Sequence, residues 1–124
     1  MAQPLALLLY ERLLPGSQLV NRLQDLGYRV QPLSSPSNLP ETAERDKPLL
    51  VLADVEAHQT EVCDAISKLK QNSVTSHVPV IAFAGDKNDA ALTAARAAGA
   101  TLTVTDMAIL NYLGQFLDQA LQVD

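Results

Sequence analysis

The chain has 124 residues and a mass of 13.3 kDa, a size typical of one domain that buries its own hydrophobic core. Hydrophobic residues make up 48% and charged residues 19%, which excludes a disordered or fibrous chain. The net charge of −5, without a lysine- and arginine-rich window, excludes a dedicated nucleic-acid binder.

We expect one cytoplasmic domain over residues 1–124 that does not enter a membrane. No apolar run approaches the roughly 20 residues of a membrane span, and the start of the chain lacks the basic residues of a signal peptide. The single cysteine, Cys63, cannot form an internal disulfide, which fits a reducing compartment.

Short apolar runs alternate with helical patterns along the chain. Continuous runs of this length are typical of strands buried on both faces of a parallel sheet, and they predict strands at 5–10, 28–33, 49–53, 78–84 and 101–104. Helical periodicity predicts a first helix with Leu19, Leu23 and Leu26 on its inner face, ended by Gly27. Further helices are predicted at 60–71, at 88–98 before Gly99 and from 105–106 to about 121, with one short helix in the loop 34–48.

Strand and helix alternate five times, which requires a parallel sheet with helices on both faces. In such folds ligands bind beyond the carboxyl ends of the strands, near the point where the strand order reverses. If the order is 2-1-3-4-5, Glu11 and Asp54 face each other across one crevice. The residues that follow the strands are therefore the candidates for a site: Tyr10, Glu11, Asp54, Ala84, Gly85, Thr105 and Asp106.

Several segments at matching spacing resemble the receiver domains of two-component response regulators, over essentially the whole chain. Segment 49–54 resembles the third strand of the family and places Asp54 at the phosphoacceptor position. Segment 79–84 matches the fourth strand, 98–100 the Ala-Gly-Ala before the fifth strand, and 27–28 the Gly-Tyr after the first helix. The resemblance implies a flavodoxin-like α/β three-layer fold with a five-stranded parallel sheet of order 2-1-3-4-5.

The chain departs from the family at most of the positions that carry its chemistry. In the family, an acidic pair and the phosphorylated Asp bind magnesium, while a Thr or Ser and a Lys hold the phosphoryl oxygens. Here the acidic pair falls on Tyr10 and Glu11, the hydroxyl position on Ala84 and the lysine position on Asp106. The position of the aromatic switch in strand five falls on Thr103.

These losses predict a degenerate pseudo-receiver. A carboxylate at the lysine position repels a phosphoryl group instead of neutralising its charge. We expect no catalytic residue and no cofactor, although the two acids Glu11 and Asp54 could still bind a cation weakly.

The candidate acids each have a simpler interpretation beside the functional one. Asp54 is either a phosphoacceptor or metal ligand, or a loop acid that is solvated or caps the next helix. Glu11 is a metal ligand or a plain charge after a strand, and Asp106 is expected as the N-cap or a first-turn acid of the last helix. Cys63 is expected as a partly buried small hydrophobe, and His58 and His77 have no partner at metal-ligand spacing.

The last helix carries more apolar residues than one narrow face can use. The surplus either covers the edge of the sheet or forms a partner surface, which includes a homodimer through this helix. The candidate interface residues are Leu110, Tyr112, Leu113 and Phe116.

The predicted function is a non-catalytic, phosphorylation-independent protein-interaction module in signal transduction or regulation, with an unidentified protein partner. One alternative is an atypical response regulator that a histidine kinase phosphorylates on Asp54. Another is a small-ligand sensor that binds an apolar or quinone-like molecule in the crevice around Tyr10, Phe83 and Ala84.

Overall fold

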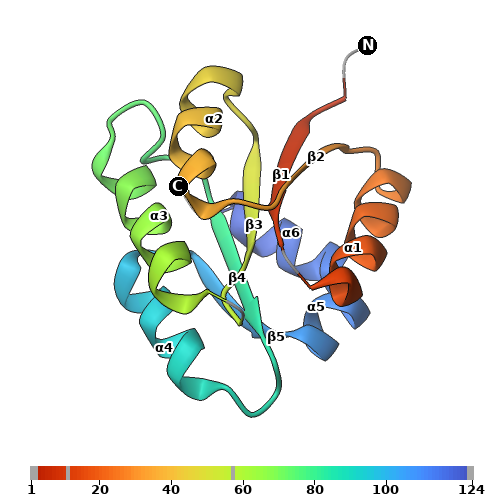
Figure 1. Cartoon of the computed structure of the whole chain (residues 1–124). Helices are drawn as coiled ribbons and strands as arrows, with labels where there is room; N and C mark the ends of the chain where they lie inside the picture. The colour runs from red at the N-terminus through yellow and green to blue at the C-terminus, as the bar shows by residue number, and fades with distance from the viewer. Residues whose placement is uncertain (1–2, 11, 57, 123–124) are drawn as a thin grey trace.

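The computed structural model describes residues 3–10, 12–56 and 58–122. In this part of the chain, five strands form one parallel sheet of order β2-β1-β3-β4-β5 (Figure 1). The predicted flavodoxin-like fold and strand order are therefore confirmed. The strands are β1 (Leu5–Leu9), β2 (Arg29–Leu33), β3 (Leu50–Asp54), β4 (Val80–Ala84) and β5 (Leu102–Thr105).

Helices cover both faces of the sheet and complete three layers (Figure 1). Helices α2, α3 and α4 pack on one face, while α1, α5 and α6 pack on the other. No helix of the described residues is both long and apolar enough to cross a membrane. The helices are α1 (Leu13–Asp25), the 3-10 turn η1 (Pro36–Asn38), α2 (Leu39–Asp46), α3 (Gln59–Gln71), α4 (Asp89–Ala98), α5 (Asp106–Asn111) and α6 (Leu113–Gln122).

The central strands explain the uninterrupted apolar runs. Side chains alternate across a sheet, so Leu7 and Leu9 of β1 join the cluster under α2–α4, while Ala6 and Leu8 join the cluster under α1, α5 and α6. Every residue of β1, β3 and β4 is buried. Because both faces are covered, polar residues have no place in these strands until their carboxyl ends.

Glycine ends α4 as the sequence predicted. Gly99 has φ +117°, a left-handed conformation that side chains disfavour, and its amide closes the last turn on Arg96. A Cβ at this position would lie 2.8 Å from Cγ of Lys70. The turn therefore needs glycine for both its conformation and its space.

Two expectations about helices are wrong. Leu26 is 50% exposed instead of lying on the inner face of α1, because the helix ends at Asp25 and Leu26 is already its C-cap. The last helix is two helices, since the backbone leaves helical geometry at Tyr112 (φ −127°, ψ 28°). Asn111, Tyr112 and Gly114 are weak helix formers, and they gather at this break.

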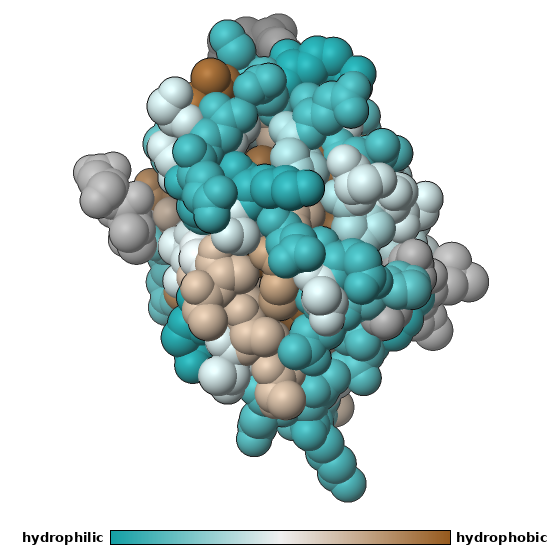
Figure 2. Space-filling view, turned by 60° about the vertical axis from the view of Figure 1, so that its left-hand side comes forward, coloured by the Kyte–Doolittle hydropathy of each residue, from teal (hydrophilic) through white to brown (hydrophobic). Residues whose placement is uncertain are grey.

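The surface over α3 and α4 is mostly hydrophilic, with a pale apolar area over α4 (Figure 2). Ala90 and Ala97 are exposed there, and Ala94 is half-buried. Ala91 and Ala95 are the buried residues of α4, with Leu92 and Ala98 partly buried against the same core.

Candidate functional site

The carboxyl ends of the strands bring four loops to one edge of the sheet. Asp54 is paired with Phe83 across β3 and β4, and Ala84 with Thr105 across β4 and β5. The chain leaves β1 at the same edge, because Leu9 pairs with Ala53. Residues just beyond these strands therefore meet, although they are far apart in the sequence.

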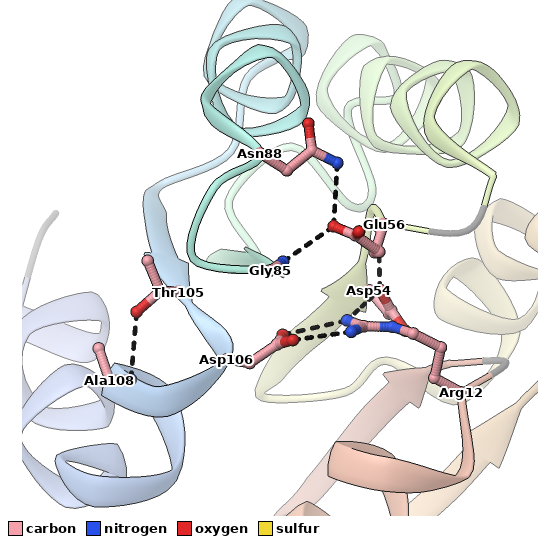
Figure 3. Close-up of polar contacts among 8 residues, drawn as sticks. All are labelled: Arg12, Asp54, Glu56, Gly85, Asn88, Thr105, Asp106 and Ala108. Atoms are coloured by element: carbon pink, nitrogen blue, oxygen red, sulfur yellow. Dashed lines mark hydrogen bonds and ion pairs between the residues drawn. The ribbon is translucent and has the colours of Figure 1, made fainter.

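Arg12 lies at the centre of this edge and binds two carboxylates (Figure 3). Its Nε donates to Oδ2 of Asp54 at 2.9 Å, and its Nη2 donates to Oδ1 of the same residue at 2.9 Å. Its Nη1 and Nη2 also donate to Asp106, at 2.7 Å to Oδ2 and 3.0 Å to Oδ1. One planar guanidinium thus makes a bidentate pair with each acid, the geometry in which arginine and carboxylate bind most strongly. We call these three residues the Arg12 clamp.

The clamp is partly shielded from solvent. The Asp54 side chain is 1% exposed, while those of Arg12 and Asp106 are 27% and 22% exposed. The hydrogen bond with Asp106 and the bonds and charge of Asp54 raise the pKa of Arg12 above its usual range, although burial opposes the shift. Arg12 is consequently a fixed cation that neutralises a buried acid.

Helix dipoles act in opposite directions on the two ends of the clamp. Arg12 is the N-cap of α1, where a positive charge is unfavourable, whereas Asp106 is in the first turn of α5, where a negative charge is favourable. Thr105 caps α5 by accepting a hydrogen bond from the amide of Ala108. The two carboxylates therefore provide the main electrostatic reason for a cation at this position.

Glu56 extends the network to the loop after β4. The amide of Glu56 donates to Oδ1 of Asp54 at 2.9 Å. Its own Oε1 accepts from the amide of Gly85 at 2.8 Å and from Nδ2 of Asn88 at 2.9 Å. Asn88 in turn caps α4 by accepting from the amide of Ala91. A continuous polar chain therefore joins all four loops of this edge (Figure 3).

The bonds to Glu56 predict an acid-dependent loss of stability. Hydrogen bonds from Asn88 and Gly85 hold the pKa of Glu56 below its ordinary value of 4.5, which favours the native state only while the carboxylate is ionised. This contribution is complete above about pH 4.5 and disappears as pH falls through the lower native pKa. We expect Glu56→Gln to reduce unfolding free energy by about 0.5 kcal/mol at pH 7, because the group is largely solvated. Urea denaturation should show that the difference in unfolding free energy between Glu56→Gln and the unmodified protein is smaller at pH 3 than at pH 7. A difference that grows at pH 3 would contradict this assignment.

Comparisons with known proteins identify the fold. No protein-family model and no curated protein matches the sequence. Solved structures do match: a protein assigned as a response regulator from Chloroflexus aurantiacus has a TM-score of 0.87 at 17% identity, covering 97% of this chain and 98% of its own. The receiver domain of a sensor histidine kinase from Pseudomonas aeruginosa, solved with magnesium in its active-site cleft, has a TM-score of 0.86 at 19% identity over 97% and 98%. The receiver domain of NtrX from Brucella abortus has a TM-score of 0.82 at 16% identity over 96% and 99%.

This chain has the receiver-domain fold. Within that fold, the sequence resemblance placed the family's positions on particular residues, and the structure describes the surroundings of all of them except Glu11.

Tyr10, at the first position of the acidic pair, is a packing residue in this receiver fold. Its ring lies directly against Gly16 of α1, so that a Cβ on Gly16 would collide with the ring. The amide of Tyr10 donates to the carbonyl of Leu33. The second position, Glu11, lies outside the described residues, so the predicted approach of Glu11 to Asp54 stays a prediction.

Ala84 stands where receivers have a Thr or Ser, and Thr103 stands where they have an aromatic switch residue. Ala84 is fully buried in the core cluster under α2–α4. Thr103 is half-buried, and its hydroxyl accepts a hydrogen bond from Arg96 of α4 at 2.7 Å. The ligand-sensor hypothesis placed a crevice around Tyr10, Phe83 and Ala84. Its placement at Phe83 and Ala84 is wrong because both side chains are fully buried, whereas Tyr10 is half-buried.

The predictions for Asp54 and Asp106 differ in how well they agree with the structure. The interpretation of Asp54 as a solvated loop acid is wrong, because Asp54 is buried and bound by Arg12. Asp54 does not cap α3 either, because it accepts from the amide of Glu56 and the N-cap of α3 is His58. Asp106 was expected as the N-cap or a first-turn acid of one last helix; it lies in the first turn of α5, with Thr105 as the N-cap. The expectation for Cys63 also holds, since it is half-buried and burial raises the pKa of its thiol.

The sequence interpretation missed Arg12 and Glu56. The available signal was charge: two acids were predicted at one buried edge without a cation, and Arg12 is the base nearest the end of β1. Glu56, two residues after Asp54, gave no comparable signal, because its partners lie in another loop. Among the described residues, no group of three His, Cys, Asp or Glu side chains could hold a metal ion.

The candidate interface residues separate into exposed and buried ones. Leu113 is 3% exposed and belongs to the core, so its assignment to an interface is wrong. Leu110 and Phe116 are half-buried against the same core. Tyr112 is 53% exposed, and Met107, which was not among the candidate interface residues, is 62% exposed.

Proposed function

We propose that this chain is a pseudo-receiver: a non-enzymatic protein-interaction module of signal transduction that works without phosphorylation of Asp54. The observation that carries the proposal is the Arg12 clamp. It supplies the acceptor-equivalent carboxylate with a permanent internal cation.

The clamp opposes phosphoryl transfer to Asp54 in two ways. Both oxygens of Asp54 already accept hydrogen bonds, from Arg12 and from the amide of Glu56, so nucleophilic attack requires Arg12 to move. If Arg12 moved, a buried carboxylate would be left unpaired and the charge of Asp106 would face the incoming phosphoryl group.

The described residues also do not fit a magnesium ion. Magnesium requires near-octahedral oxygen ligation, commonly with one or two carboxylates and several waters. Tyr10 packs on Gly16, and the oxygens of Asp54 are bound to a guanidinium, which excludes a second cation from the same atoms.

Acetyl phosphate with magnesium provides the direct test. We expect intact-mass spectrometry to show no acid-labile adduct of about 80 Da, the mass that one phosphoryl group adds. An ordinary receiver treated in parallel serves as the positive control for the reagent. An adduct that disappears in Asp54→Asn would overturn the proposal and support the alternative of an atypical phosphorylated regulator.

The homodimer surface that we propose is centred on Tyr112, at the break between α5 and α6. Tyr112 is the exposed aromatic residue of this region, and aromatic residues are frequent anchors of interfaces. We expect Tyr112→Ala to weaken self-association by about 1–2 kcal/mol without a change in thermal stability. Analytical ultracentrifugation measures this, with Leu26→Ala, a similarly exposed residue at the end of α1, as the matched control. If the unmodified protein is monomeric, the proposed homodimer is wrong.

A further inference from the structure

We infer that the groove between the β4–α4 loop and α5 binds a basic, amphipathic peptide segment of a partner protein. The inference rests on the proposed function, since it gives the interaction module a binding site. The groove has a volume of about 890 Å³ and borders the Arg12 clamp at Asp106. Its lining includes Glu56, Asp86 and Asn88 on one side and Asp106, Met107 and Leu110 on the other.

The charges at the groove favour a cationic occupant. The groove and the clamp together hold four carboxylates, on Asp54, Glu56, Asp86 and Asp106, and two cations, on Arg12 and Lys87. Both acids of the clamp share the single charge of Arg12, so a net negative charge remains. The chain as a whole carries −5, which steers a basic partner toward it.

Glu56, on the side of the groove formed by the loops after β3 and β4, is held in place without a ligand. Oε1 of Glu56 is fixed by the amide of Gly85 and the side chain of Asn88 (Figure 3). These bonds also lower the pKa of Glu56, so the carboxylate is ionised at neutral pH. A fixed charge loses little conformational freedom on binding, which strengthens a charge-assisted contact.

The opposite wall supplies an apolar contact. Met107 and Leu110 are three residues apart on α5, so they share one face of the helix, and Met107 is 62% exposed. An unbranched, polarisable methionine side chain adapts to varied apolar groups. The groove therefore fits a peptide whose apolar side chains contact Met107 and Leu110 while its basic side chains contact the acids of the opposite wall.

The shape of the groove and the charge of the chain favour a peptide over other occupants. A pocket for a small molecule usually encloses roughly 70–90% of the surface of its ligand. This groove is open to solvent, and Asp86, Lys87 and Met107 in its lining are exposed. A second copy of the chain would bring another net charge of −5 to an acidic groove. Tyr112, the proposed anchor of a homodimer, is not among the residues that line the groove.

The experiment uses three synthetic peptides and the full chain labelled with ¹⁵N. The probe is the acetylated and amidated heptapeptide Lys-Leu-Ala-Lys-Leu-Ala-Lys. One control peptide replaces each Lys with Glu, and the other replaces each Leu with Ser. Titration at low salt should shift the amide signals of Gly85–Asn88 and of Met107–Asn111 with the probe. The shifts should be absent with the Glu peptide, weaker with the Ser peptide, and reduced at high salt.

Variants localise the binding. Asp86→Lys and Met107→Ala should each weaken the affinity for the probe about tenfold, the effect of losing one good anchor. Asp25→Lys and Leu26→Ala, an exposed acid and an exposed apolar residue at the end of α1, are the matched controls and should leave the affinity unchanged. Glu56 is not substituted, because it holds the loop after β4.

Each outcome decides the inference. No shift at millimolar probe, shifts outside the groove, equal binding of the Glu peptide, or equal loss in the control variants would overturn it. If acetyl phosphate modifies Asp54 while the probe still binds the groove, the proposed function fails and the groove remains a peptide site. If Asp54 stays unmodified and the probe does not bind, the pseudo-receiver stands and this inference fails.

Discussion

Arg12→Met is expected to lower the free energy of unfolding by about 2–3 kcal/mol. Removing one partner of a buried ion pair commonly costs about 3–5 kcal/mol, and the partial exposure of Arg12 and Asp106 reduces that value. The substitution keeps the length of the aliphatic chain but leaves the Asp54 carboxylate buried without a cation. Since small domains are stable by only about 5–15 kcal/mol, the loss should be evident in urea denaturation at pH 7.

Arg45→Met is the matched control for this prediction. Arg45 also forms hydrogen bonds and an ion pair, with Asp46, but its side chain is 64% exposed. Exposed pairs contribute about 0–1 kcal/mol, so this variant should remain close to the unmodified protein. In the Arg12→Met background, Asp54→Asn should restore stability, because it removes the unpaired charge. If Arg12→Met and Arg45→Met have equal effects, the clamp does not stabilise the fold.

Asp106→Lys is expected to destabilise the chain without restoring phosphorylation. The new ammonium group would lie beside the guanidinium of Arg12, whose bonds of 2.7 and 3.0 Å to Asp106 would be replaced by repulsion between like charges. We expect a loss of about 1–3 kcal/mol, larger than that of Asp106→Asn, which removes the attraction but adds no charge. The order of the two losses is measured by urea denaturation.

Phosphorylation should remain absent in Asp106→Lys, although this change restores the residue type that the family has at that position. Arg12 still binds both oxygens of Asp54, and Ala84 still has no hydroxyl group. Intact-mass spectrometry after treatment with acetyl phosphate and magnesium measures this. A phosphorylated Asp106→Lys protein would show that the missing lysine was the only defect of the site.

The fold could be predicted because its determinants are local and repeated. Buried strands produce continuous apolar runs such as Leu5–Leu9 and Val80–Ala84, and Gly99 marks a helix end through a conformation that few other residues adopt. The break at Tyr112 escaped prediction because the apolar pattern of α5 and α6 continues across it. Periodicity reports which side chains are buried, and it does not report one non-helical backbone position.

The site was only partly predictable, for a different reason. Spacing alone placed Asp54 and Asp106 at one edge of the sheet, because each follows directly from the end of a strand. The partner of both acids is set by the reach and rotamer of Arg12, 42 residues before Asp54 and 94 before Asp106. Matching the family position by position assigned a role to Tyr10 and Glu11 and did not consider the residue after them.

The clamp also changes what this edge of the molecule can sense. A metal ion and a phosphoryl group are exchangeable, so their occupancy follows the supply of magnesium and of phosphodonor. Arg12 is tethered to the chain a few residues from the end of β1, and its effective concentration at Asp54 is therefore set by covalent structure and not by the composition of the surrounding solution. The cation that pairs with Asp54 is therefore in place as soon as the chain has folded. Under the function proposed above, regulation would act on the amount of the module, its location or its access to a partner.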